Sequence, residues 1–404
     1  MSKEKIFRII KKVVNPTVIK VIIFLIPVIV LIIFKAMKKT LSFESIFDVK
    51  TFVAIIIAFI CQAIAYSIVS LVERYCEDAT KLTVNYNALI KKYSRVKLLE
   101  YKGNKFPVEQ LILRCYDQQP FDIDIDDTNS DKNYQLPKQI AAKSDYLMQA
   151  HRFSVVYNAM NIRLDDVKRQ DDKISILYSR TYYYDSLITN RAMDYRLDNG
   201  KTIRDIYEPG PFLNTLKDSK MSNHLGFNGF IELQNGKIIF IVRDNNLSIG
   251  KRTLGCSIGA SLKSAHALED DRKLSLKGLN RAIIKEIKDE LNIDIGENTD
   301  VTKGIFVFCR DILEGGRPQF IFYWKTNLKE EDFRTNFKQG VKNIKKDKIS
   351  TKMDGSEYLL LTVEDLERCT IQPDKIVLNG KNYRMMPLAS ASIVFLLKHL
   401  RKDN

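Results

Sequence analysis

The sequence predicts two N-terminal transmembrane α-helices followed by a soluble α/β region that ends in an α/β/α sandwich. Two long apolar stretches near the start of the chain predict the membrane helices. The pair Asn235-Gly236, between two segments rich in β-forming residues, predicts a hairpin in the second half of the chain. A helix with several carboxylates, further strands and a closing helix follow, which is the order expected of a layered α/β domain.

The apolar stretches cover residues 17–37 and 51–73, while the rest of the chain is polar and charged. About 20 apolar residues cross a bilayer as a helix, so each stretch is expected to span it. No small-residue cleavage site follows the first stretch, which argues against a signal peptide. Residues 1–16 are then a basic tail and residues 38–50 a short external loop. The lysines and arginines around the spans favour both termini in the cytoplasm.

The second stretch carries a stripe of small and polar residues at four-residue spacing. The stripe includes Ala54, Ala58, Gln62 and Ser70. Small and hydrogen-bonding residues are those that helices use to pack against each other in lipid. We expect the stripe to contact either the first span of the same chain or a second copy of the chain.

Composition narrows the class of partner. The net charge of +15 in 404 residues comes from lysines and arginines that flank the spans or alternate with acids. This distribution predicts a basic pocket for a small anionic ligand and no binding of duplex nucleic acid. The six cysteines show no C-x2-C spacing, which argues against zinc and fits a reducing compartment.

Residues 74–222 are expected to form a neck helix and an α/β connecting region. The neck covers residues 73–102, where apolar residues recur at helical spacing. The acidic run from Asp122 to Asp131 is expected to be an exposed loop, and Lys173–Thr181 a strand. Residues 223–404 are expected to be the final domain. Its predicted elements are strands 227–233, 237–243, 254–262, 301–310, 317–325 and 358–362 and helices 279–291 and 388–400.

Three carboxylates of the helix expected at 279–291 share one arc. Successive helical residues are separated by about 100°, which places Glu286, Asp289 and Glu290 together. Such oxygens suit a hard divalent cation, Mg²⁺ or Mn²⁺. The alternative is that they are ordinary surface charges of an amphipathic helix, because Lys and Glu are common on exposed helix faces.

Residues 285–293 resemble the Nudix box, G-x5-E-x7-R-E-U-x-E-E-x-G-U, in which U is a bulky aliphatic residue. Glu286, Ile287, Asp289, Glu290 and Ile293 fall in register. Lys285 stands at the Arg position and Asn292 at the Gly position, while Asp271 and Lys277 replace the upstream Gly and Glu. The resemblance implies a Nudix-like sandwich over residues 223–404 with a degenerate box. These departures favour binding over hydrolysis, so no catalytic residue is assigned and no cofactor is required; Mg²⁺ at the three carboxylates remains an expectation.

Other side chains are candidates for holding a ligand. We expect Arg180, Arg243 and also Arg317 to bind phosphate, His224 to hydrogen-bond a base or phosphate, and Tyr323 to stack on a base. Each has an alternative interpretation. The arginines are equally surface charges, and Tyr323 could face the core. A histidine in such a position is more often structural, and this alternative is favoured for His224.

Two spans, a connecting region and a terminal Nudix-like domain resemble the transmembrane Nudix effectors of bacterial cyclic-oligonucleotide antiphage (CBASS) systems. The resemblance implies that a CD-NTase cyclase makes a cyclic nucleotide, that the Nudix-like domain binds it, and that the spans self-associate and disrupt the lipid of the inner membrane. The expected location is therefore the bacterial inner membrane. The alternatives are a membrane-anchored Nudix hydrolase that cleaves a nucleoside diphosphate derivative with Mg²⁺, and a scaffold that binds only protein.

Overall fold

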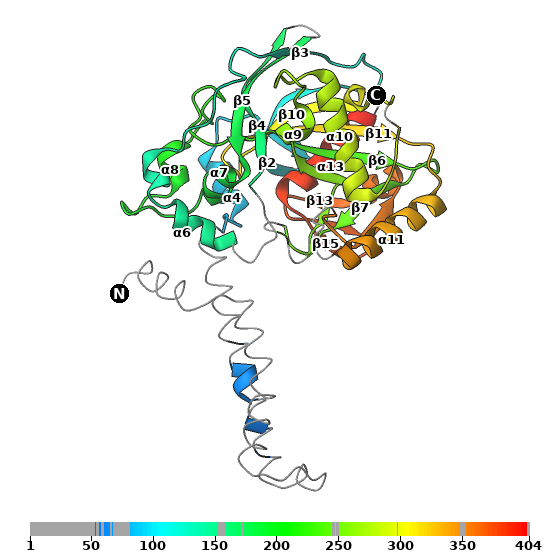
Figure 1. Ribbon diagram of the computed structural model, residues 1–404. Helices are drawn as coiled ribbons and strands as arrows, with labels where there is room; N and C mark the ends of the chain where they lie inside the picture. The colour runs from blue at the N-terminus through cyan, green and yellow to red at the C-terminus, as the bar shows by residue number, and fades with distance from the viewer. Residues whose placement is uncertain are drawn as a thin grey trace. The chain divides into compact units, whose positions relative to one another are not determined.

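The structure is a computed structural model. It describes residues 81–151, 158–170, 173–244, 250–296, 298–347 and 353–401, with residues 53, 56, 57, 60–64, 67 and 247. The chain divides into two compact units, Met1–Ala79 and Thr80–Asn404. The second unit contains the sheets and the helices described below (Figure 1).

One mixed sheet forms the centre of the second unit. Its order is β1-β2-β10-β11-β6-β7-β12, with β9 paired to β6 and β8 paired to β7. Strands β6 and β11 run parallel, and their neighbours in the sheet are antiparallel. The bounds are β1 Leu98–Tyr101, β2 Asn104–Leu113, β6 Gly226–Glu232, β7 Ile238–Val242, β8 Leu254–Gly255, β9 Ile258–Ser261, β10 Ile305–Asp311, β11 Arg317–Lys325 and β12 Glu357–Leu361.

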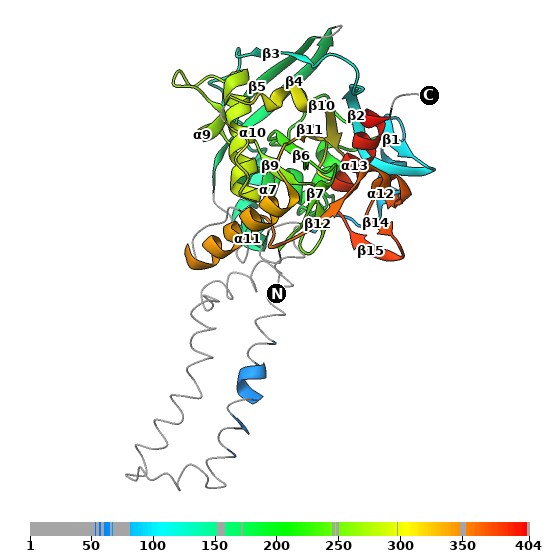
Figure 2. The ribbon, with the colours of Figure 1, turned by 90° about the vertical axis from the view of Figure 1, so that its right-hand side faces the viewer.

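Helices cover both faces of this sheet. Helix α10 (Leu276–Leu291) lies on one face and α13 (Pro387–Leu400) on the other (Figure 2). Both faces of the sheet carry apolar side chains that a helix can cover. Strand β11 is an example, because side chains alternate between the two faces of a strand. Phe320 and Phe322 are buried in the core that includes α10, whereas Ile321 and Tyr323 belong to the core that includes α13. The burial of these apolar side chains holds the three layers together.

Local sequence defines helix α10. Its Ser275 N-cap accepts a hydrogen bond from the Gly278 N–H at 2.9 Å, which satisfies one of the free donors of the first turn. Gly278 permits a close approach of the preceding helix α9 (Ser264–Ala267), since a Cβ there would lie 1.9 Å from the Ala267 carbonyl oxygen. The helix ends at Asn292 with φ of 55°, a left-handed conformation that asparagine tolerates.

A three-stranded sheet and a group of short helices complete the unit around the centre. The sheet has the order β3-β5-β4 and pairs β3 with β5 in parallel. Its strands are β3 Asp122–Asp126, β4 Met160–Gln170 and β5 Lys173–Tyr182. The short helices are α5 Lys138–Ala141, α6 Ser144–Met148, η2 Gln149–His151, α7 Tyr183–Ile188, η3 Asn190–Ala192 and α8 Ile203–Tyr207. Apart from η2, the short helices contribute to a separate apolar cluster.

The remaining elements lie at the margins of the main sheet. A second three-stranded sheet, β13-β14-β15, packs near α13. The elements are α4 Tyr86–Lys92, η4 Val301–Gly304, α11 Glu330–Asp347, α12 Val363–Arg368, β13 Thr370–Gln372, β14 Lys375–Leu378 and β15 Lys381–Arg384.

Most of the elements expected after residue 222 are confirmed. The predicted hairpin is β6–β7, the box helix is α10, and the predicted strands 317–325 and 358–362 are β11 and β12. The predicted strand 301–310 is η4 followed by β10, and the predicted strand 254–262 is two short strands, β8 and β9. The sequence did not predict α11, whose face toward the core carries Phe333 and Phe337.

Two expectations for the connecting region are wrong. Among the described residues of the expected neck, the helix is only α4, seven residues long, and a strand follows it at Leu98. Tyr93, the C-cap of α4, is fully buried, and its hydroxyl donates a hydrogen bond to the Glu208 carbonyl at 2.6 Å. Helix α4 therefore packs against other parts of residues 80–404. The acidic run expected as a loop contains β3, in which Ile123 is buried between exposed aspartates. The main sheet also crosses the boundary drawn at residue 222, because β2 pairs with β10.

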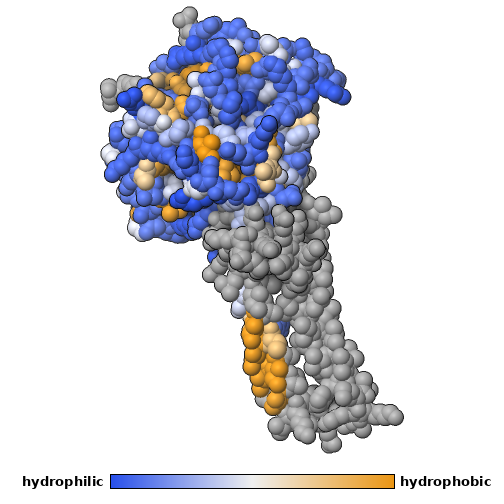
Figure 3. All heavy atoms as spheres, turned by 90° about the vertical axis from the view of Figure 1, so that its left-hand side faces the viewer, coloured by the Kyte–Doolittle hydropathy of each residue, from blue (hydrophilic) through white to orange (hydrophobic). Residues whose placement is uncertain are grey.

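The expectation of two transmembrane helices is corrected. Among the described residues, no helix is long and apolar enough to cross a membrane, a task that needs about 20 consecutive apolar residues. The same finding overturns the expected fold class and the expected multi-pass location in an inner membrane with both termini cytoplasmic. Residues 1–52 and the stripe members Ala54, Ala58 and Ser70 lie outside the described residues, and Gln62 is half-buried in a helix. The described isoleucines of this segment are exposed, as the orange spheres of Figure 3 show.

Candidate functional site

The carboxylates that resemble the Nudix box lie on one side of α10. Glu286 and Glu290 are one turn apart and only 5% and 6% exposed. Asp289 lies between them and is more open to solvent. The predicted grouping on one helix arc is therefore present, but the glutamates are buried and not displayed on a free surface.

Each of these carboxylates already has a partner. The Lys263 Nζ lies 2.5 Å from Oε1 of Glu286, and the Lys285 Nζ lies 3.0 Å from Oδ2 of Asp289. The Gly259 N–H donates to Oε2 of Glu290 at 3.3 Å. The pair to Glu286 is largely buried, whereas the pair to Asp289 is a helix-surface contact.

Burial changes the protonation of the two glutamates. It raises the pKa of Glu286, an effect that the Lys263 ammonium opposes. Burial also raises the pKa of Glu290 well above its usual range, helped by Asp354 and Glu286 and opposed by Arg243. A divalent cation binds ionised oxygens. In the described part of the chain, no group of three His, Cys, Asp or Glu side chains is arranged to hold a metal ion, and the lysine-bound carboxylates do not fit one.

Three segments meet beside these carboxylates. The Ile162 N–H donates to the Leu262 carbonyl at 2.9 Å, the Leu262 N–H to the Leu225 carbonyl at 2.9 Å, and the Leu225 N–H to the Ile162 carbonyl at 2.8 Å. All three side chains are buried in the core that includes α10. Because side chains alternate along extended chain, Asn161 and His224 point the other way.

The residues around this meeting point, Asn161, His224, Lys263, Arg317 and Gln319, are here called the polar junction. Asn161 forms a β-bridge with Lys263, whose ammonium binds Glu286. Gly226 adjoins the junction from β6: a Cβ there would lie 2.3 Å from Oε1 of Gln319 and 2.5 Å from Nη2 of Arg317. The absence of a side chain at residue 226 therefore leaves room for both polar groups.

Several polar atoms of the junction have no hydrogen-bond partner among the described residues. They are both ring nitrogens of His224, both amide atoms of Asn161 and Nε2 of Gln319. His224 is fully buried, and Asn161 and Gln319 are each 1% exposed. An unsatisfied buried polar group costs about 1–3 kcal/mol. So many such groups in one place indicate a position for water or for a polar ligand.

Burial, together with nearby positive charge, keeps the ring of His224 neutral. Burial lowers the pKa of His224 well below its usual value, and the nearby guanidinium groups of Arg317 and Arg191 lower it further. A neutral imidazole offers one donor and one acceptor. His224 is thus a neutral hydrogen-bonding group beside cations, and it lacks the bonds that a purely structural histidine would make.

The structure distributes the predicted ligand residues over three places. Arg243 lies beside the carboxylates: Nη1 is 2.8 Å from Oδ2 of Asp354 and would be 3.6 Å from a Cβ at Gly259. Arg180 instead donates to the Arg272 carbonyl at 3.0 Å. Tyr323 lies on the α13 side of the sheet, where it is buried and donates to a carboxylate oxygen of Glu232. The structure therefore places Arg243 beside the box and His224 with Arg317 in the polar junction, and leaves Arg180 and Tyr323 elsewhere.

Sequence reasoning missed Asn161 and Gln319. Neither belongs to a motif, and the residue that each one adjoins at the junction is distant in the chain, Lys263 for Asn161 and Gly226 for Gln319. One signal was present: residues 161–165 alternate polar and apolar side chains, Asn-Ile-Arg-Leu-Asp, which predicts a strand with one polar face.

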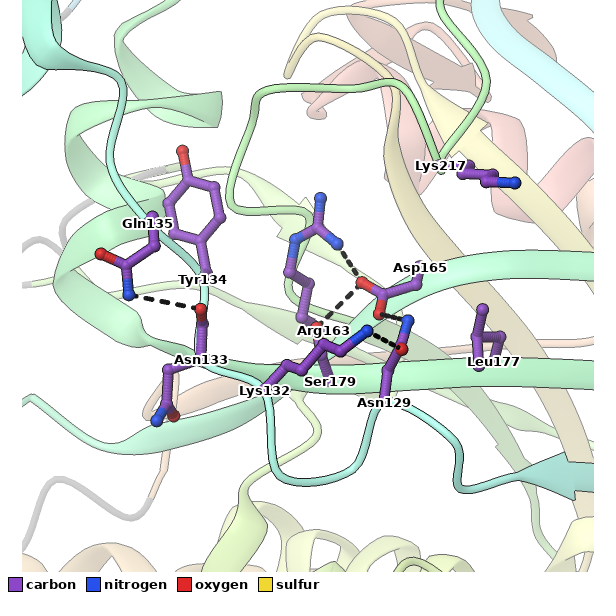
Figure 4. A pocket seen from close by; sticks show the side chains of 10 residues that line it. All are labelled: Asn129, Lys132, Asn133, Tyr134, Gln135, Arg163, Asp165, Leu177, Ser179 and Lys217. Carbon is purple, nitrogen blue, oxygen red and sulfur yellow. Dashed lines mark hydrogen bonds and ion pairs between the residues drawn. The ribbon is translucent and has the colours of Figure 1, made fainter.

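A separate cavity of about 290 Å³ lies beside β4 and β5 (Figure 4). Asp165 is at its centre and binds Arg163, the Ser179 hydroxyl at 2.8 Å and the Asn129 amide at 3.0 Å. Lys132 in turn donates to Asn129 at 2.7 Å. Asp165 and its three partners drawn in Figure 4 thus form a connected hydrogen-bond network, whereas the side chains of Asn161 and His224 in the polar junction have no hydrogen-bond partner within the described part of the chain.

A buried acid near the junction predicts a pH-dependent stability. Burial, with the nearby Glu314, raises the pKa of Asp311 to about 7, whereas an unfolded chain releases this proton near pH 4. Between these values the unfolded state binds fewer protons, so the free energy of unfolding falls as the pH rises. From pH 5 to pH 8, the free energy of unfolding should therefore fall less in Asp311→Asn than in the unmodified protein. Urea denaturation at both pH values measures this change. Equal losses in the two proteins would contradict this assignment.

Compared with models of known protein families, the sequence matches none, and a comparison with curated proteins finds no significant match. The function is therefore inferred from the site.

Proposed function

We propose that residues 80–404 include a Nudix-like domain that binds a cyclic nucleotide and does not cleave it. The chain would act as the sensor of a bacterial antiphage (CBASS) system in which a CD-NTase cyclase supplies the messenger. Binding would promote self-association of the chain. The observation that supports this proposal is the engagement of Glu286 by Lys263 directly beside the unsatisfied donors and acceptors of the polar junction.

Three cations near the site are of the type that binds an anionic ligand, and each pairs with a carboxylate. Lys263 and Arg317 lie at the junction, and Arg243 lies beside Glu290 and Gly259. Phosphate is recognised by such cations and by neutral donors nearby. Hydrolysis of a diphosphate by a metal-dependent route needs free carboxylates to hold the cation, and two of the three carboxylates here bind lysines. The site is therefore better suited to holding a phosphate ligand than to cleaving it.

The direct test uses the full chain and a panel of cyclic di- and trinucleotides, each titrated by calorimetry and then recovered for chromatography. We expect at least one member to bind and to be recovered intact. The absence of binding by every member would overturn the proposal, and so would recovery of cleaved ligand.

The variant His224→Leu separates a ligand role from a structural one. Leucine is similar in size but makes no hydrogen bond, so the variant removes two unsatisfied buried atoms. We expect its melting temperature without ligand to be equal or higher, and its affinity for the bound nucleotide to fall about tenfold, which corresponds to one lost hydrogen bond of roughly 1.4 kcal/mol.

The matched control is Lys217→Met. Lys217 is an exposed cation at the separate cavity of Figure 4, so its loss should leave the affinity unchanged. If His224→Leu lowered the melting temperature and left the affinity intact, His224 would be a structural residue.

A hydrolase is the second candidate, because Glu286 and Glu290 share one helix face next to Gly259. For this function, the full chain with Mg²⁺ would release phosphate from a nucleoside diphosphate derivative. Release that Glu290→Gln abolishes would decide in favour of the hydrolase.

A further inference from the structure

We infer that Asn161 reads the edge of a nucleobase in the bound ligand. This inference rests on the proposed function and deepens it, because it assigns the base to one part of the polar junction. Asn161 is 1% exposed, and neither its Oδ1 nor its Nδ2 has a partner among the described residues. An asparagine buried without partners is costly, so a ligand that satisfies both atoms would gain that energy.

The position of Asn161 supports this assignment. It lies on β4 opposite Thr181 and forms a backbone bridge with Lys263, whose ammonium binds Glu286. Residues opposite each other on antiparallel strands have Cβ atoms about 4.5–5.5 Å apart. A ligand with its phosphate near Lys263 would therefore extend its base toward Asn161.

The chemistry of the amide fits a base better than a phosphate. Phosphate oxygens only accept hydrogen bonds, and they would leave Oδ1 of Asn161 unsatisfied. A base edge that carries a donor beside an acceptor pairs with both amide atoms, as adenine does through N6 and N7. His224 in its neutral form adds one donor and one acceptor on the same side of the junction.

An aromatic side chain lies next to His224. The ring of Tyr183 lies 6.2 Å from the ring of His224, and Tyr183 is half-buried at the start of α7. Planar aromatic side chains are surfaces on which bases stack. The base would then lie between the Asn161 amide and the Tyr183 and His224 rings, with its phosphate at Lys263.

The test measures selectivity between bases and not affinity alone. The cyclic homodinucleotides of adenine, guanine, cytosine and uracil, and the four nucleoside monophosphates, are titrated into the full chain, into Asn161→Val and into the control Lys217→Met. A good bidentate pair contributes about 1–3 kcal/mol of discrimination. We expect Asn161→Val to bind the preferred base at least tenfold more weakly and to lose most of its preference, while Asn161→Gln, which keeps the amide, retains part of it.

The outcomes distinguish this inference from the proposed function. Binding of monophosphates but of no cyclic dinucleotide would overturn the proposed function, and a change of base preference in Asn161→Val would still support base reading. An unchanged ratio of affinities in Asn161→Val would overturn the inference, because the amide would then hold buried water only. Failure of every probe to bind the unmodified chain would overturn both. Asn161→Val removes unsatisfied atoms, so a retained melting temperature will show that it folds.

Discussion

Replacing Arg204 by methionine is expected to lower the free energy of unfolding by about 3–5 kcal/mol, the usual cost of breaking a buried ion pair from one side. The Arg204 side chain is 3% exposed. Its Nε lies 2.7 Å from Oδ1 of Asp194, and its two terminal nitrogens donate to the Ile312 and Leu313 carbonyls at 2.8 and 2.7 Å. Methionine would fill the space but leave one carboxylate and two carbonyls without their donor.

The chain segment that Arg204 holds in place also contacts the polar junction. Ile312 and Leu313 belong to the connection between β10 and β11, which also carries Glu314, the partner of Arg317 at 2.5 Å. Urea denaturation of the full chain, followed by circular dichroism, measures the stability. Arg204→Lys keeps the charge but loses the fork of donors, so an intermediate loss is expected. A loss below about 1 kcal/mol in Arg204→Met would show that this contact contributes little.

Replacing Lys263 by methionine is expected to cost up to about 3 kcal/mol at pH 8, the lower end of the range for a buried pair because its side chain is 24% exposed. The change leaves the buried carboxylate of Glu286 beside Glu290 without its cation. Protonation relieves an unpaired buried carboxylate, so the cost should shrink toward pH 5. We also expect Mg²⁺ to raise the melting temperature of this variant and not that of the unmodified protein, because the carboxylates become free to bind a cation.

The matched control for this prediction is Lys285→Met. Lys285 pairs with Asp289 on the same helix, but its side chain is 40% exposed, and such pairs contribute at most about 1 kcal/mol. The double variant Lys263→Met with Glu286→Gln removes both charges and should recover much of the stability. An equal loss in Lys263→Met at pH 5 and pH 8 would argue against an unpaired Glu286 as its cause.

The elements that the sequence predicts well have local signals. Asn235-Gly236 marks the β6–β7 turn, and the carboxylate arc with Asn292 at its end predicts α10 within a few residues of its observed ends. Long apolar stretches are also a local signal, but hydropathy alone does not show that a helix crosses a membrane. The aspartates around Ile123 obscured β3, whose edge position leaves them exposed.

The site was harder to predict because it is assembled from distant segments. Asn161 comes from β4, His224 from the residues before β6, Lys263 from those after β9, and Gln319 from β11. Each is an ordinary polar residue in its own neighbourhood, and only the meeting of three chain segments brings them together. His224 was a candidate because of its residue type, whereas the bridge between Asn161 and Lys263 follows from tertiary structure alone.

The pairing of β2 with β10 has a consequence for how the chain folds during its synthesis. Val108 pairs with Asp311, so one edge of β2 lacks its partner until most of the chain has left the ribosome. At about 5–20 residues per second, that edge waits roughly ten seconds or longer. An unpaired strand edge is a template for association with other chains. Newly made protein is therefore most prone to aggregate in this interval. A chain truncated before β10 keeps the unpaired edge of β2 permanently.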